Sequence, residues 1–344
     1  MKNSKILWMA LIPLLTLLML VNVGLGSVVI PWTEVIDIIL GNSSSNPGWN
    51  TIIREFRLPK TLTAVLAGSG LAISGLLMQT LFRNPLAGPF VLGISSGASL
   101  GVALLIMATQ ILGVTWMAHA WGSGATVLAA VAGSGFILLV ILTASFYIGD
   151  SMTLLIIGLM LGSLSGALVS VLQYFSQAEQ IQSYLIWTFG SLGGVHGAEL
   201  WWLAAIVVLG SFLSWLMVKP LNSLLLGETY ARSMGVSLRT TRLLIIISTA
   251  LLAGGITAFC GPLAFIGIAI PHLARILFKT SDHRKLVPAS LLLGAIIMVL
   301  CDTIAQVPGT PQTLPINAIT SLVGAPAVIA ILIRNRQLGK SFAK

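Results

Sequence analysis

Charge is scarce in this sequence: only 8% of its 344 residues are Asp, Glu, Lys or Arg, whereas 56% are apolar. A soluble domain of this length needs far more charge to cover its surface, so the composition excludes one. The mean hydropathy is +1.00, and apolar runs of about 20 residues recur along the chain. Such runs cross a bilayer as helices and are too continuous for the alternating strands of a membrane barrel. We therefore predict an all-α, polytopic membrane protein in which residues 1–344 form a single transmembrane domain.

Residues that carry chemistry are also scarce. The only two cysteines, Cys260 and Cys301, lie inside apolar runs, so neither a disulfide nor a metal site is indicated. The sequence contains no phosphate-binding loop, no His-Glu-x-x-His motif and no serine-hydrolase elbow. Its four histidines are dispersed, and we expect His283, in a polar stretch at 281–285, to be solvated. We predict no catalytic residue, no metal ligand and no cofactor within this chain, which is therefore not expected to be an enzyme.

Spans of about 20 residues predict ten membrane crossings. The first run is longer than the apolar region of a signal peptide, which favours a retained first span over cleavage near residues 24–27. Residues 30–40 are expected to form a short helix on the membrane surface, and residues 180–192 are too polar for a full crossing. The predicted crossings lie near residues 6–26, 60–81, 89–108, 124–147, 153–174, 198–218, 243–259, 262–278, 286–305 and 315–333.

The net charge of +9 follows membrane orientation better than it fits nucleic-acid binding, because the basic residues are scattered between the apolar spans. If the side of Lys2 and Lys5 is inside, all 18 Lys and Arg residues fall inside except Arg54, Arg57 and Lys60. This asymmetry places both termini in the cytoplasm. The three outer cations precede the second span. They could neutralise lipid headgroups or a nearby Glu, or they could bind acidic groups of a protein that docks from outside.

A polar, basic loop at about 219–242 separates the sixth and seventh predicted spans. We expect a short helix in it that opens after Gly227, with Glu228 in the first turn, and that ends at Gly235 in a left-handed conformation. Tyr230 and Met234 give the loop apolar surface that a solvated tether does not need. The loop is either an ordinary structured connection or a surface presented to a partner.

One carboxylate, Asp302, lies deep in an apolar run. Intramembrane acids are candidates for proton coupling or gating, but Asp302 lies near the outer end of its span, where a helix-end hydrogen bond fits equally well. Glycines also recur at spacing four in the predicted third and fifth spans. They either allow close helix packing or leave room along a pathway. These rows are Gly93, Gly97 and Gly101, and Gly158, Gly162 and Gly166.

A set of short motifs runs in order along nearly the whole chain. They are Arg57-Leu58-Pro59-Lys60, Ser74-Gly75, Gln79, Arg83-Asn84-Pro85-Leu86-Ala87, Leu92-Gly93, Gly97-Ala98, Gly190-Ser191-Leu192, Leu226-Gly227-Glu228, Ala231, Gly235, Pro271-His272, Arg275, Asp282-His283-Arg284, Gly294-Ala295, Asp302 and Gly324-Ala325-Pro326. Together they resemble the iron–siderophore/haem/vitamin B12 permease family of ABC importers, the FecCD type. The resemblance implies a type II ABC importer fold in a bacterial inner membrane.

This resemblance also implies partners. They are a second permease copy, with the translocation path on the dimer axis; two cytoplasmic ATPase subunits that hold ATP and Mg; and a periplasmic or lipid-anchored substrate-binding protein. Ferric siderophore is the expected cargo, ahead of haem and cobalamin.

Site residues follow from the same resemblance. It implies ATPase coupling by Gly227, Glu228, Ala231, Arg232 and Gly235, and cytoplasmic loop contacts by Arg83, Asn84 and Pro85. Binding-protein docking, with the periplasmic segment at about 27–59, is implied for Arg54, Arg57, Lys60 and Gln306.

The chain departs from the family pattern at two docking positions. Gln306 stands where the family often has an arginine, so one outer cation is missing. Lys60 replaces a common arginine, which keeps the charge but not the bidentate geometry.

One expectation rests on helix position, and two alternative functions stay open. The weakly polar Ser165, Ser170 and Gln173 on the fifth span are expected to line the path. The alternative function is an ion- or proton-coupled secondary transporter with Asp302 as its coupling acid, and a channel or scaffold protein is a third possibility.

Overall fold

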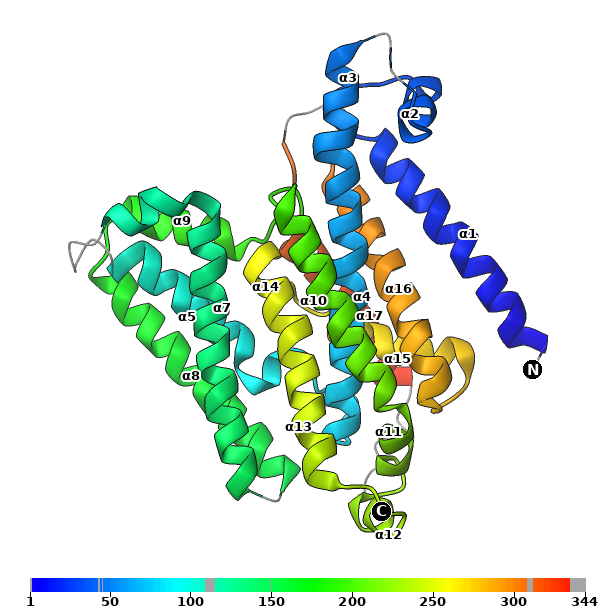
Figure 1. Cartoon of the computed structure of the whole chain (residues 1–344), viewed down its shortest axis with the longest axis vertical. Coiled ribbons are helices and arrows are strands. Elements are labelled where there is room, and N and C mark those ends of the chain that lie inside the picture. Colours follow the sequence, from blue (N-terminus) through cyan, green and yellow to red (C-terminus); the bar gives the residue numbers. More distant parts are fainter. Residues whose placement is uncertain are drawn as a thin grey trace.

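The computed structural model describes residues 2–42, 44, 46–108, 115–148, 150–307 and 312–334. Within these residues the regular elements are all helices, apart from a single bridge between Gln306 and Thr313. Figure 1 shows a bundle whose two ends carry different short helices. One end carries α2 (Trp32–Ile39) and α3 (Pro47–Thr51), and we refer to it as the α3 end. The other carries α11 (Val218–Leu224) and α12 (Glu228–Ser233), and we refer to it as the α12 end.

The central helix is α4 (Leu58–Leu81), which continues a rod formed by α3 and the π-helical turn η1 (Ile52–Arg57). Nearly all of α4 is buried, because α1 (Lys2–Gly24), α10 (Ala198–Leu216), α13 (Leu238–Thr249), α15 (Ile266–Phe278) and α16 (His283–Ala305) pack around it. Its sequence is rich in Gly, Ala and Ser, which lets these neighbours approach closely.

A second group of helices lies beside the first (Figure 1). In it, α5 (Ile94–Ala103) packs between α7 (Thr115–Tyr147) and α8 (Ser151–Tyr174), and the short α9 (Ala178–Thr188) follows. The remaining elements are η2 (Pro89–Leu92), η3 (Leu104–Ala108), η4 (Ala250–Gly254), α14 (Gly255–Cys260) and α17 (Ile316–Arg334).

The predicted crossings correspond closely to these helices. Seven described helices are long and apolar enough to span a membrane. Three shorter apolar helices, Ile94–Ala108, Ile266–Phe278 and Ile316–Ala330, coincide with the predicted third, eighth and tenth spans. The prediction of an all-α, multi-pass membrane protein is confirmed. The short helix expected near 30–40 is present as α2, and the stretch at 180–192, predicted to be too polar for a crossing, contains the 11-residue α9 and no spanning helix.

Glycines sit where helices cross most closely. A Cβ on Gly75 of α4 would collide with the backbone of Gly267 in α15, and Gly68 and Gly294 meet in the same way between α4 and α16. On α5, Gly97 and Gly101 face the backbone of α7. Gly158 of α8 contacts the backbone of Val91 and Leu92, whereas nothing lies within 4 Å of a Cβ on Gly166. The packing interpretation is thus confirmed for the α5 row and for Gly158.

Candidate functional sites at the two ends of the bundle

The loop between α10 and α13 is folded at the α12 end. Leu221 and Leu224 of α11 are buried and anchor it to the bundle. Gly227 then adopts φ +110°, a value that favours glycine, and α12 begins at Glu228. Gly235 has φ +81°, so the predicted left-handed end of the helix is confirmed. Ala231 is fully buried, whereas Tyr230 is 52% exposed and Met234 58% exposed. The loop therefore shows apolar side chains to its surroundings from a fixed base.

An ion pair ties the start of α12 to the bundle. Glu228 Oε1 lies 3.4 Å from Arg242 Nη2 and accepts a hydrogen bond from Ser151 Oγ at 3.0 Å. Arg242 is itself buried at the start of α13, and its Nη1 donates to the Ile148 carbonyl at 3.2 Å. Glu228 thus connects α12 both to α13 and to the first residue of α8.

The predicted contact loop Arg83–Pro85 lies beside α12. A hollow of about 770 Å³ separates the two, and Arg83, Asp150, Gly227, Glu228 and Tyr230 all line it. Asp150 caps α8, and hydrogen bonds from the Thr153 hydroxyl and backbone N–H lower the pKa of its carboxyl. Asn84 Oδ1 accepts from the backbone N–H of Leu86, which shapes the loop before Pro89. The structure therefore places Arg83 beside Gly227 and Glu228 of the predicted coupling group, whereas Asn84 and Pro85 do not line the hollow.

A buried histidine, His283, connects α11 at this end of the molecule to α16 and α4. His283 is fully buried, so the expectation that it is solvated is wrong. Its Nδ1 lies 2.8 Å from Asn222 Oδ1, and its Nε2 lies 2.9 Å from Thr80 Oγ1 of α4. The side-chain amide of Asn222 also donates to Asp282 Oδ1 at 2.7 Å. The Arg284 backbone N–H, followed by this amide, lowers the pKa of Asp282. Charge patterning missed this link between α11, α16 and α4, because a polar stretch reads as solvent-exposed.

Two arginines at the α3 end bind backbone carbonyls of this chain. Arg57 donates from Nη1 to the carbonyls of Val23 and Gly24, at 3.1 and 3.0 Å, and from Nη2 to that of Val28. Arg54 donates to the carbonyls of Ile38 and Asn42, at 3.4 and 3.2 Å. Both side chains therefore attach the end of α1 and the segment after it to η1 of the central rod.

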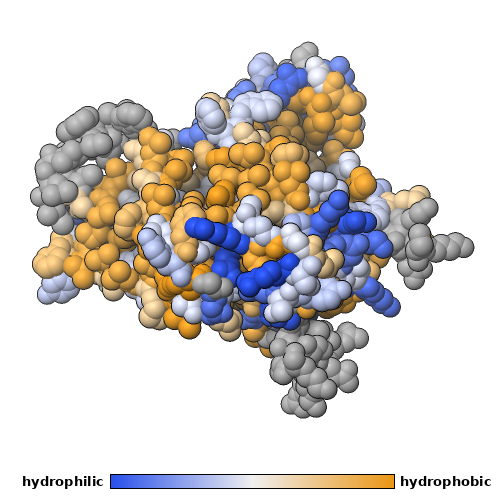
Figure 2. All heavy atoms as spheres, turned by 60° about the horizontal axis from the view of Figure 1, so that its bottom comes forward, coloured by the Kyte–Doolittle hydropathy of each residue, from blue (hydrophilic) through white to orange (hydrophobic). Residues whose placement is uncertain are grey.

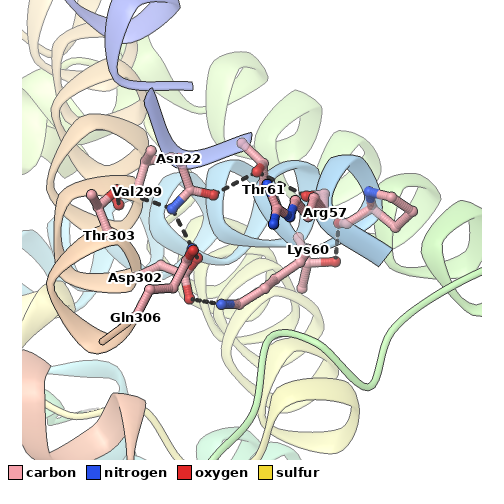
Figure 3. A network of polar contacts seen from close by, with 10 residues as sticks. Asn22, Arg57, Lys60, Thr61, Val299, Asp302, Thr303 and Gln306 are labelled. Atoms are coloured by element: carbon pink, nitrogen blue, oxygen red, sulfur yellow. Dashed lines mark hydrogen bonds and ion pairs between the residues drawn. The ribbon is translucent and has the colours of Figure 1, made fainter. Parts of the chain in front are cut away.

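Asp302 accepts three hydrogen bonds or ion pairs in a network that joins α1, α4 and α16 (Figure 3). Lys60 Nζ lies 3.0 Å from Asp302 Oδ1. Asn22 Nδ2 and Gln306 Nε2 donate to Oδ2 at 2.9 and 3.1 Å. Asn22 also accepts from the Thr61 hydroxyl and donates to Thr303 Oγ1 at 2.9 Å. The carboxylate is almost fully buried, and the ammonium group of Lys60 compensates its charge within the chain. Asn22 was not expected here, and its only signal is an amide near the end of an apolar run.

A cavity of about 310 Å³ lies next to this network, and Arg57, Lys60 and Gln306 are among its lining residues. Three of the four predicted docking residues are therefore gathered at one cavity, whereas Arg54 is not in its lining.

The three predicted path residues do not share one face of α8. Ser165 is buried, while Ser170 is exposed and donates to the Gly166 carbonyl at 3.1 Å. Gln173 is partly exposed. In the described part of the chain, no three His, Cys, Asp or Glu residues lie close enough to hold a metal ion.

Comparisons with known proteins cover nearly the whole chain. A model described as the FecCD transport family matches residues 14–334. The haemin transport system permease protein HmuU of Yersinia pestis is 36% identical over 322 residues, which cover 93% of this chain and 95% of HmuU. The vitamin B12 import system permease protein BtuC of Salmonella paratyphi A is 37% identical over 283 residues, which cover 82% of this chain and 83% of BtuC.

Two solved structures share the fold. One, described as an inward-facing conformation of a metal-chelate type ABC transporter, superposes with a TM-score of 0.82 at 30% identity and covers 96% of this chain and 99% of its own. The other, PsaBC from Streptococcus pneumoniae in complex with Fab, superposes with a TM-score of 0.53 at 17% identity and covers 82% and 93%.

Proposed function

The chain belongs to the FecCD transport family, and from this premise we propose that it is the membrane-spanning permease of an ATP-driven importer. ATP would be hydrolysed on separate subunits, and two copies of this chain would enclose the path. The α12 end would face the cytoplasm, because Arg83, Lys219, Arg232, Arg239 and Arg242 belong to the segments gathered there. The α3 end would face the periplasm and receive the substrate-binding protein near Arg57 and Lys60.

One observation carries the proposal most directly: α12 is a short helix with a rigid base and an apolar exposed side. A helix that only connects two spans gains nothing from exposing Tyr230 and Met234 to water. Because Glu228, Arg242 and Ser151 fix its first turn, a force applied to α12 is passed to α8 and α13. This is the arrangement needed to couple ATPase movements to the spans.

The proposed cargo is a metal chelate, with ferric siderophore as first candidate and haem and cobalamin as the others. The names of the relatives support bulky metal-containing cargo, since HmuU is described as a haemin permease and BtuC as a vitamin B12 permease. No residue pattern in the described spans selects among the three.

The test is ATP hydrolysis by the permease with its ATPase and binding protein in nanodiscs, with each of the three cargoes in turn. The double variant Tyr230→Ala/Met234→Ala should fold normally, because both side chains are more than half exposed. We expect the ATPase concentration needed for half-maximal hydrolysis to rise about 10–30-fold, as for the loss of an aromatic anchor from an interface.

The matched control is Val208→Ala/Phe212→Ala, which removes two exposed apolar side chains from α10, away from the loop. It should leave hydrolysis unchanged. If no ATPase assembles with the wild-type chain, or if the α12 variant stimulates hydrolysis as the wild type does, the proposed coupling is wrong. Stimulation by one cargo alone would identify it.

A further inference from the structure

Arg83 has an unusual backbone conformation. It follows the end of α4 with φ +48°, a left-handed value that residues other than glycine rarely adopt. The Asn84 N–H donates to the Gln79 carbonyl at 3.2 Å, and the Arg83 N–H donates to the Thr80 carbonyl at 3.3 Å. This pair of bonds closes a helix with a Schellman motif, whose left-handed position is usually glycine. The chain therefore keeps an arginine where glycine would cause less strain, and such strain often marks a functional position.

The Arg83 side chain points toward α12. Its Nη1 lies 3.9 Å from the position that a Cβ on Gly227 would occupy, and the residue lines the hollow between α4 and α12. Figure 2 shows hydrophilic residues gathered at this end of the molecule, surrounded by the apolar sides of the helices. Arg83 is exposed, and it lies beside Gly227, where the proposed coupling helix begins.

Carboxylates near this hollow already have partners. Glu228 pairs with Arg242, and Asp150 accepts two bonds from Thr153. Asp282, the other acid at this end, accepts from Asn222 and caps α16. Among the residues that the structure describes, none of these three acids pairs with Arg83. A guanidinium binds a carboxylate through two parallel hydrogen bonds, so Arg83 offers a strong contact to an acidic group from another chain.

We propose that the strained turn at Arg83 presents its guanidinium to a carboxylate of the ATPase subunit, forming a second contact beside α12. This inference rests on the proposed function, since it requires an ATPase partner at the α12 end. Together, the apolar side of α12 and the cation of Arg83 would hold the partner at two points that belong to different helices. Such a contact would report ATPase movements directly to α4, the central helix of the bundle.

The decisive variant is Arg83→Gly, because glycine suits the left-handed backbone and removes only the guanidinium. We expect its melting temperature in detergent to equal or exceed that of the wild type, by on the order of 1 °C. In nanodiscs we expect the affinity of the ATPase subunit to fall at least about 10-fold, as for a lost charged contact. The affinity of Arg83→Lys for the ATPase subunit should lie between those of the wild type and Arg83→Gly, because lysine keeps the charge but cannot form the two parallel hydrogen bonds of a guanidinium.

The chain offers a matched control. Lys279 ends α15 in the same left-handed conformation, with φ +47°, but does not line the hollow. Lys279→Gly removes an exposed cation from a second backbone position with positive φ and should leave ATPase binding unchanged. Equal losses in the two variants would point to general surface charge and overturn the proposal.

Lipid is the other anionic partner that Arg83 could meet, so binding is measured in nanodiscs with and without anionic phospholipid. The loss of ATPase binding in Arg83→Gly should persist in zwitterionic lipid. If the loss occurs only with anionic phospholipid, Arg83 binds lipid rather than the ATPase, and the proposal is wrong. A lower melting temperature for Arg83→Gly would mean that the side chain is structural, which also overturns the proposal. If the wild type binds an ATPase and Arg83→Gly binds it equally well, only this inference fails. If the wild type binds none, the proposed function itself fails.

Discussion

At the scale of single residues, Lys60 is the counter-charge of the buried carboxylate of Asp302. Asp302→Asn leaves the ammonium group without its counter-charge in a mostly buried setting, and it also replaces an acceptor of two amide hydrogen bonds. We expect the free energy of unfolding to fall by about 2 kcal/mol, less than for a fully buried pair because Lys60 is partly exposed. Lys60→Gln alone should also be destabilising. In a double-mutant cycle the two changes together should cost about 1 kcal/mol less than their sum. Additive losses in chemical denaturation would show that the pair is not coupled.

The same variant separates the importer from a proton-coupled transporter. A coupling acid must exchange protons with a pathway, whereas Asp302 is buried and bonded to Lys60, Asn22 and Gln306. Uptake by Asp302→Asn should therefore remain dependent on ATP and insensitive to a protonophore.

The sequence predicts features that depend on neighbouring residues in the chain, but not contacts with residues that are distant in the chain. The positions of Gly227, Glu228 and Gly235 follow from local backbone rules, and the structure places them as predicted. The partners of His283 and Asn22 come from helices far away in the chain, so no local pattern reveals them. The left-handed conformation of Arg83 was likewise hidden, because an arginine gives no signal of positive φ.

At the scale of helices, the close crossing of α4 and α15 leaves no room for a side chain at Gly75. Gly75→Ala places a methyl group against the backbone of Gly267, which cannot move without shifting α15. We expect a loss of about 1–3 kcal/mol in stability, as for overpacked cores, and a lower melting temperature in detergent. Gly166→Ala is the control, because the space beside it is open. That change should be neutral or slightly stabilising, since alanine favours the helix. Equal melting temperatures for the two variants would contradict the crossing geometry.

Hydropathy predicts that a helix spans a membrane but not what covers it. The windows in Pro47–Leu81 and Ser151–Tyr174 have mean hydropathies of 1.7 and 2.2, yet 83% of the first and 22% of the second are buried. An apolar side chain suits both lipid and a helix neighbour, so the sequence could not separate the central α4 from the peripheral α8. Breaks within spans were also missed. Gly93, with φ +72°, divides the predicted third span into η2 and α5.

At the scale of the whole molecule, the uneven distribution of basic residues predicts orientation. The proposed topology puts α12 in the cytoplasm and the α2–α3 segment outside. The two native cysteines are buried, so single cysteines can be introduced without removing them. Asn42→Cys at the α3 end and Ser233→Cys on α12 both replace exposed side chains. An impermeant maleimide should label Asn42→Cys in intact spheroplasts, whereas Ser233→Cys should react only after the membrane is opened. The reverse labelling pattern would mean that the α3 end faces the cytoplasm. An ATPase could then bind only at the α3 end, and Arg83 could not contact one of its carboxylates.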